Sequence, residues 1–72
     1  MTTVNAVEQK FIEHQKTGAN TYMAPAKNMN DWYKDELLFV RKVENNEVIV
    51  FRSMDNKLYT LSETKLIDFK LL

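Results

Sequence analysis

The chain has 72 residues, of which 44% are hydrophobic and 28% charged, and ten Lys and Arg residues balance ten Asp and Glu residues. This length predicts one domain, residues 1–72, because a domain usually has about 100–200 residues, and the apolar content is that of a folded protein. The absence of Cys excludes disulfides and thiolate metal sites, and a net charge of zero argues against non-specific binding to nucleic acid.

The first predicted element is an amphipathic helix over residues 5–17. Apolar residues recur at helical spacing on one face of it, namely Val4, Val7 and Phe11. Asn5 is the expected N-cap, because Glu8 follows three places later in capping-box spacing. Gly18 stands where a left-handed residue commonly ends a helix.

Residues 18–35 are predicted to be a long connection between the helix and a sheet. Tyr22 and its neighbours can form a short extended piece, which Pro25 ends because proline has no amide donor. Asn28 or Asn30 can cap a single helical turn after it. The segment is rich in large apolar side chains, namely Tyr22, Met23, Met29, Trp32 and Tyr33. So much apolar surface indicates either a lid over the sheet or a binding surface.

A β-meander of three or four antiparallel strands is predicted over residues 36–72. Asn45 and Asn46 separate two apolar runs and suit a two-residue turn with positive φ at both positions. Asp55 and Asn56 are the expected second turn. The two turns predict these cross-strand pairs: Val43 with Val48, Arg41 with Val50, Phe39 with Arg52, Arg52 with Tyr59, and Val50 with Leu61.

Under these registers, both faces of the sheet are apolar. One face would hold Leu37, Phe39, Val43, Val48, Val50, Tyr59 and Leu61, and the other Leu38, Val40, Ile49 and Phe51. A last strand is predicted from the alternation of Ile67, Phe69 and Leu71 with polar residues. The expected fold class is therefore α+β with a strongly bent sheet, of which an SH3-like small barrel is one example.

Catalytic chemistry finds little support in the residue pattern. His14 is the single side chain expected to titrate near neutral pH, and no nucleophile lies near it in the sequence, so we interpret it as an ordinary surface histidine. The clustered carboxylates are interpreted as solvated charges, because a hydrolase site needs concave walls built from more chain; these are Asp31, Asp35, Glu36, Glu44 and Glu47. We expect no enzyme activity, no metal site and no cofactor.

The favoured hypothesis is a small protein-interaction module, such as an adaptor, an inhibitor or a subunit of the size that phages and mobile elements encode. Aromatic and Met side chains are enriched at protein-recognition surfaces. The predicted partner-binding residues are Tyr22, Met29, Trp32 and Tyr33, with an exposed edge strand as another means of contact. The apolar surplus on both faces also allows a homodimer.

The alternative hypothesis is a nucleic-acid-binding small barrel. Its residues would be the cations of the first hairpin, Arg41, Lys42, Arg52 and Lys57, with Phe39, Phe51 and Tyr59 as stacking neighbours. Acidic residues at the same hairpins weaken this hypothesis. The first ten residues lack the pattern of a signal peptide, and no run approaches the roughly 20 apolar residues that span a bilayer. We therefore expect a cytoplasmic protein without membrane contact.

Overall fold

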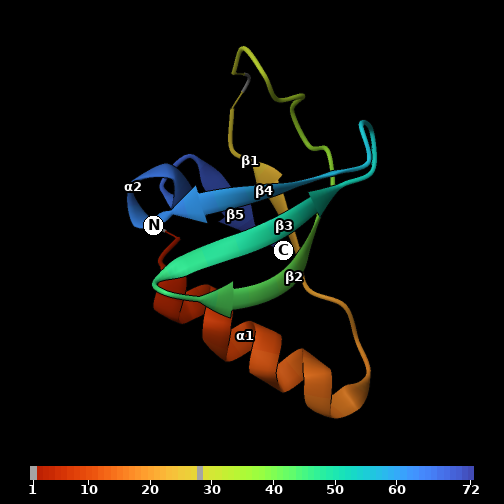
Figure 1. The fold of residues 1–72 in the computed structure, drawn as a ribbon, viewed down its shortest axis with the longest axis vertical. Coiled ribbons are helices and arrows are strands. Elements are labelled where there is room, and N and C mark those ends of the chain that lie inside the picture. Colours follow the sequence, from red (N-terminus) through yellow and green to blue (C-terminus); the bar gives the residue numbers. More distant parts are fainter. Residues whose placement is uncertain (1, 28) are drawn as a thin grey trace.

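A computed structural model describes residues 2–27 and 29–72, and it confirms the α+β class. In chain order, the elements are α1 (Val4–Thr17), β1 (Tyr22–Pro25), β2 (Leu38–Glu44), β3 (Glu47–Arg52), β4 (Lys57–Ser62), α2 (Glu63–Leu66) and β5 (Phe69–Leu71). The strands form one antiparallel sheet in the order β4-β3-β2-β1-β5. Figure 1 shows the sheet bent, with β1 and β5 behind β3 and β4, and α1 along β2 and β3.

Helix α1 ends where predicted, but it begins one residue earlier and its N-cap is a different residue. Gly18 adopts a left-handed φ of 77°, as expected of a residue that ends a helix. At the other end, the hydroxyl of Thr3 accepts a hydrogen bond from the amide of Ala6, at 3.1 Å. The prediction of Asn5 as the cap was wrong, because Glu63 of α2 binds the free amide of Val4 at 2.9 Å and so extends the helix by one residue.

The sheet has one more strand than expected, because the predicted connection contains β1. Tyr22 pairs with Phe39 of β2, and Ala24 pairs with Lys70 of β5, so β1 lies between two strands that are distant in sequence. Pro25 ends the strand, as its missing amide donor predicts. The three strands from residue 38 to residue 62 do form the predicted meander.

The first hairpin turn was predicted correctly. Asn45 and Asn46 have φ values of 52° and 60°, the left-handed conformation that a two-residue hairpin turn requires. Beyond the turn, Val43 pairs with Val48 as expected.

A β-bulge at Arg41 overturns the rest of that register. The pairing shifts by one residue between Val40 and Lys42, so the predicted pairs of Arg41 with Val50 and of Phe39 with Arg52 were wrong. The observed pairs are Val40 with Val50, Phe39 with Phe51, and Leu38 with Arg52. Because a one-residue slip exchanges the faces of a strand, Leu38 and Val40 point into the core and Phe39 points to the outer face.

The second hairpin differs from the prediction by two residues. Its loop covers residues 53–56, and Asn56 has a φ of 61°. The predicted pairs of Arg52 with Tyr59 and of Val50 with Leu61 were therefore wrong. The observed pairs are Arg52 with Lys57, Val50 with Tyr59, and Val48 with Leu61. Since side chains alternate with a period of two, this shift leaves every residue of β4 on its predicted face.

The core lies between the inner face of the sheet and the two helices. It consists of Val4, Val7, Met23, Leu38, Val40, Val48, Val50, Leu61, Leu66 and Phe69.

The opposite face carries an apolar row with one residue from each of four adjacent strands, which we call the outer row: Tyr22, Phe39, Phe51 and Leu58. Ile67, which was expected in the last strand, instead ends α2 and is exposed. No helix in the described residues is long and apolar enough to cross a membrane.

Candidate functional site

Trp32 packs between the two edge strands of the sheet. Its ring packs edge-on against Tyr59 of β4, with centroids 5.2 Å apart, and against Phe69 of β5, with centroids 5.1 Å apart. Strands β4 and β5 are the two ends of the sheet order and do not pair with each other. The sheet is therefore bent but not closed, and the suggested SH3-like barrel is not confirmed. Trp32 is the part of the connecting segment that acts as a lid.

The residues around Trp32 form a tight turn and not the predicted helical turn. Met29 and Trp32 make an isolated antiparallel bridge, and the amide of Trp32 donates to the carbonyl of Met29 at 3.2 Å. Asn30 lies within this turn, while Asn28 lies outside the described residues. The turn holds Met29 against the core and leaves Tyr33 exposed on the other side of Trp32.

Arg52 lies under this lid, with 6% of its surface exposed. It occupies an inward position of β3, since it alternates with Val48 and Val50. Its guanidinium carbon lies 4.9 Å from the ring centroid of Trp32 and 5.7 Å from that of Tyr59. The contact with Tyr59 is a cation–π contact between diagonal neighbours, since Lys57 and not Tyr59 is the direct cross-strand partner of Arg52.

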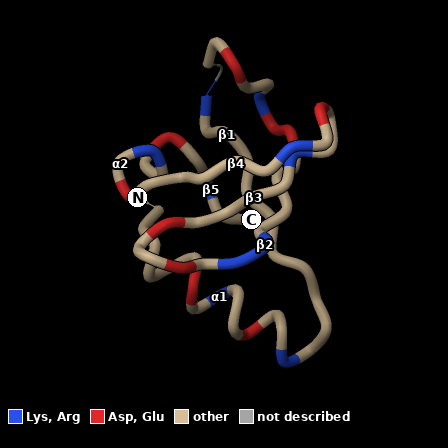
Figure 2. Tube along the Cα trace, in the orientation of Figure 1, with Lys and Arg blue, Asp and Glu red and all other residues tan. Residues whose placement is uncertain are grey.

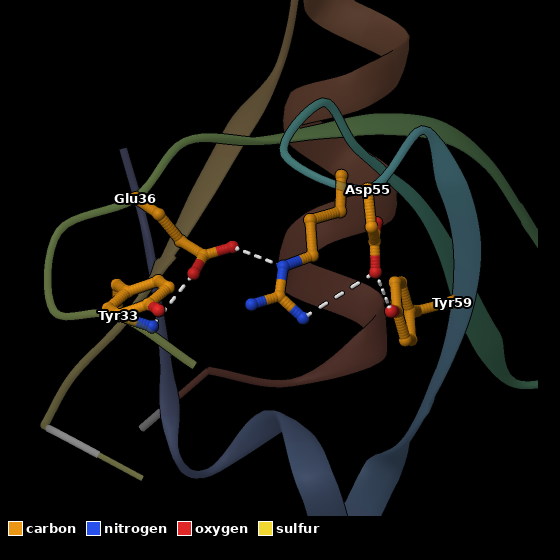
Figure 3. A network of polar contacts seen from close by, with 5 residues as sticks. Tyr33, Glu36, Asp55 and Tyr59 are labelled. Carbon is orange, nitrogen blue, oxygen red and sulfur yellow. Dashed lines mark hydrogen bonds and ion pairs between the residues drawn. The ribbon is translucent and has the colours of Figure 1, made fainter. Parts of the chain in front are cut away.

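Two carboxylates flank the side chain of Arg52, one on each side, as Figure 3 shows. Glu36 Oε1 lies 3.0 Å from Arg52 Nε, and Asp55 Oδ2 lies 3.9 Å from Nη1. The Nε–H is not directed at an acceptor, so the first contact is an ion pair without a hydrogen bond. The second oxygen of Glu36 accepts a hydrogen bond from the amide of Tyr33 at 2.8 Å. The interpretation of Glu36 as a solvated charge was wrong, because its side chain is only 14% exposed.

The same network shifts three pKa values. The hydrogen bond that the hydroxyl of Tyr59 donates to Asp55 lowers the pKa of Asp55, with help from the charge of Arg52 and against the effect of burial. That hydrogen bond and desolvation raise the pKa of Tyr59. Burial lowers the pKa of Arg52, but Tyr59 and the two carboxylates outweigh it, so the pKa is raised. All three shifts favour the charges that the network carries at neutral pH, namely a cationic Arg52, an ionised Asp55 and a neutral Tyr59.

A hollow of about 620 Å³ opens in front of Arg52. It is lined by Met29, Asn30, Asp31, Trp32, Tyr33, Arg52, Met54, Tyr59 and Lys65. Glu36 and Asp55, the two carboxylates beside the guanidinium, are not among the lining residues. Tyr33 is 65% exposed and Met54 57% exposed, so the hollow combines a fixed floor with an accessible apolar rim.

Three of the four predicted partner-binding residues meet at the hollow, and the fourth does not. Met29, Trp32 and Tyr33 line it, whereas Tyr22 belongs to the outer row, with its ring 5.8 Å from that of Phe39. The partner-binding prediction did not include Arg52 and Tyr59, which were named for the nucleic-acid alternative, and the sequence analysis missed Met54 and Lys65 altogether. A signal for Arg52 was present, because it stands at an inward position in a strand with strict alternation.

The four predicted nucleic-acid-binding residues do not form one patch. Arg41 lies over Phe39 of the outer row, at 5.5 Å, and Lys42 forms an ion pair with Glu44 at 2.8 Å. Arg52 is buried under the lid, and Lys57 pairs with it across the β3–β4 hairpin. Figure 2 shows the basic residues interspersed with acidic ones along the trace.

Two further candidate groups, Asp35 and His14, have polar partners within the fold. Asp35 pairs with Lys70 at 3.0 Å, and His14 Nδ1 lies 2.8 Å from the hydroxyl of Thr21, so this histidine is half-buried and hydrogen-bonded. Within residues 2–27 and 29–72, no group of three or more His, Asp or Glu side chains is arranged to hold a metal ion. In comparisons with protein families, curated proteins and solved structures, nothing matches this chain.

Proposed function

We propose that this protein is a small non-catalytic interaction module that binds a protein partner at the hollow in front of Arg52. The observation that supports the proposal is the exposure of Tyr33 and Met54 beside a floor that the molecule has already fixed. Tyr and Met are enriched in the contact surfaces of proteins, and Tyr often contributes much of the binding energy.

The floor is held in place before any partner arrives. Trp32 is packed against two strands, and Arg52 is held by Glu36, Asp55 and the ring of Trp32. The amide of Tyr33 is bonded to Glu36, so the backbone of the exposed rim is fixed as well. Because little has to be ordered on association, such a surface keeps more of its contact energy as affinity.

Photo-crosslinking in a lysate of the source cell tests the proposal. A benzophenone amino acid replaces Tyr33 in one variant and Ile12, which is 44% exposed on α1, in a matched control. We expect a defined protein adduct from position 33 that persists after nuclease treatment, disappears with Met54→Asp, and is absent from position 12. Adducts that are equal at both positions, or that are insensitive to Met54→Asp, would contradict the proposal.

We propose that the protein is an adaptor, an inhibitor or a small subunit, encoded by a phage or mobile element and working in the cytoplasm. A hollow with an exposed apolar rim suits a protein that acts by occupying a partner. The edge of β4 is a second contact that the same partner can use, since Leu58 beside it is 61% exposed.

A second candidate function, binding of single-stranded nucleic acid, is favoured by the outer row. The bulge places Phe39 beside Phe51 and Tyr22 on the outer face, with the guanidinium of Arg41 above the ring of Phe39. Aromatic rings with adjacent cations stack bases and bind phosphates. A fluorescence-anisotropy titration with oligo-dT in dilute buffer tests it. Binding that falls with salt and is lost in Phe51→Ser supports it, and salt-independent or absent binding removes it.

The outer row could also serve as a contact between two copies of this chain. We propose such self-association only if the oligo-dT titration shows no binding. Zero net charge gives two copies no long-range repulsion, and the row is apolar on four strands. Sedimentation velocity at increasing concentration separates a monomer from a dimer, and Phe51→Ser is the matching variant.

A further inference from the structure

We propose that the hollow accepts an uncharged, extended peptide segment, which inserts an apolar side chain and places a main-chain carbonyl against Arg52, and that it rejects anionic ligands. This inference rests on the proposed protein-binding function of the hollow and names the chemistry of the segment that enters it.

Hydrogen-bond donors are available at the floor of the hollow. A guanidinium has five N–H groups, and neither of the two carboxylates that flank Arg52 accepts a hydrogen bond from it. Its Nε is buried beside Glu36 and out of reach of a ligand. The 3.9 Å between Nη1 and Asp55 exceeds a hydrogen-bond distance, so the Nη groups are the donors that the hollow can offer. Arg52 lines the hollow and is nine-tenths buried, so a carbonyl oxygen that enters meets a donor whose position is fixed.

The charges in and beside the hollow disfavour an anion. Two cations, Arg52 and Lys65, line the hollow together with one carboxylate, Asp31. The carboxylates of Glu36 and Asp55 lie outside the lining, beside Arg52, which brings the local count to three negative charges against two positive ones. A ligand carboxylate or phosphate would add to an excess of negative charge, and at a partly buried site such like charges repel strongly. A neutral carbonyl has the same hydrogen-bonding capacity without that penalty.

A cationic ligand is disfavoured for a different reason. The ring faces of Trp32 and Tyr59, which would attract a ligand cation, are already used by the guanidinium of Arg52. Lys65 at the rim adds to the repulsion of a second positive charge. With anionic and cationic ligands disfavoured, the ligand class that remains is an uncharged peptide segment.

The rim favours an apolar side chain. Met29, Met54 and Tyr33 line it, and methionine adapts its shape to different apolar partners. A volume of about 620 Å³ lies within the roughly 300–1,000 Å³ of small-ligand sites. One side chain with its flanking peptide groups fits within such a space.

Methyl NMR with matched fragments tests the charge preference without knowledge of the partner. The protein is labelled with ¹³C at the methionine methyls and titrated separately with N-acetyl-leucinamide, with N-acetyl-leucine, and with inorganic phosphate. The first two have the same shape and differ in the charge of the terminal group. Met29 and Met54 report on the hollow, and Met23, which is fully buried in the core, is the internal control.

We expect N-acetyl-leucinamide to shift the methyls of Met29 and Met54 with a saturating curve in the millimolar range, as a ligand of this size allows. N-acetyl-leucine should bind at least about tenfold more weakly, and phosphate should leave both methyls in place. Equal or tighter binding of either anion would overturn the inference, as would the absence of any shift with the amide. In both cases the crosslinking result at Tyr33 would decide separately whether the hollow binds protein at all.

A variant with one carboxylate fewer sharpens the test. Glu36→Gln leaves two carboxylates against two cations and keeps an oxygen that can accept the amide hydrogen of Tyr33. We expect the preference for N-acetyl-leucinamide over N-acetyl-leucine to shrink at least about threefold in this variant, because the excess negative charge is gone. Glu13→Gln on the exposed side of α1 is the matched control. An unchanged preference in Glu36→Gln would show that charge is not the cause.

Discussion

The guanidinium of Arg52 lies 4.9 Å from the ring centroid of Trp32, and this contact joins the inner face of β3 to the segment between β1 and β2. The same indole packs against β4 and β5, so one side chain connects the two edges of the sheet. The hollow, the ion pairs beneath it and the exposed rim all depend on this arrangement.

Trp32 and its neighbour Tyr33 should differ sharply in their effect on stability. Trp32→Ala should destabilise the protein by about 3 kcal/mol, because it removes a partly buried aromatic ring that packs against Tyr59 and Phe69. Tyr33→Ala should change the free energy of unfolding by no more than about 0.5 kcal/mol, because its ring is 65% exposed. Urea unfolding followed by circular dichroism measures both. A larger effect from Tyr33→Ala than from Trp32→Ala would contradict the assignment of Trp32 as the lid.

The ion pair beneath Trp32 should behave as a coupled unit. Arg52→Met leaves the carboxylates of Glu36 and Asp55 without their counter-charge and should cost about 3 kcal/mol. Adding Glu36→Gln should recover about 1 kcal/mol or more relative to additivity, as expected for residues in contact. Lys42→Met, at the exposed pair with Glu44, is the control and should cost less than about 0.5 kcal/mol. Strict additivity in the double variant would show that Glu36 and Arg52 act independently.

Stability should fall in acid through the loss of the Asp55 charge. The pKa of Asp55 is lowered in the folded state, so its contribution is present above the unfolded-state value and is lost as the pH falls through the folded-state value. Tyr59→Phe removes the hydrogen bond that is the main cause of this shift. The gap in urea midpoint between wild type and Tyr59→Phe should therefore narrow below about pH 4. A gap that stays constant down to pH 2 would contradict this account.

The raised pKa of Tyr59 makes stability depend on pH in the opposite direction, with a loss as the pH rises. Its contribution is complete below the unfolded-state pKa and is lost as the pH rises through the folded-state value. The same comparison with Tyr59→Phe should therefore narrow again in strong alkali.

A substitution in the turn between β2 and β3 should increase the stability of the protein. Asn46 holds a φ of 60°, a conformation that glycine adopts without steric cost, and Asn-Gly is the preferred pair for a two-residue hairpin. Asn46→Gly should therefore stabilise the protein by about 0.5 kcal/mol. Asn20→Gly is the control, since Asn20 does not have a positive φ and should gain nothing. A lower melting temperature for Asn46→Gly would contradict the assigned turn.

Local features of the fold were predictable from short-range pattern. The spacing of Val4 and Val7, with Gly18 after them, predicted α1, and the pair Asn45 and Asn46 predicted the first hairpin. These features depend on residues within one turn or one hairpin, for which periodicity and backbone preference are sufficient. The alternation of Arg52 with Val48 and Val50 also predicted that these three side chains share one face of the sheet.

Features that depend on contacts between distant segments were not predictable. The bulge at Arg41 reversed the faces of Phe39 and Val40, and no residue pattern near it distinguishes a bulge from a regular strand. Similarly, β1 exists because β2 and β5 supply its hydrogen bonds on both sides, although its own four residues end in proline.

The candidate site shows the same division. The sequence by itself determined that the aromatic and Met side chains of residues 29–33 needed cover or a partner, because their apolar surface is too large to stay in water. Only the tertiary structure decided that Trp32 packs between β4 and β5, that Tyr33 stays exposed, and that Arg52 lies beside Trp32 between Glu36 and Asp55. Burial of a charge requires partners from elsewhere in the chain, and only the folded arrangement supplies them.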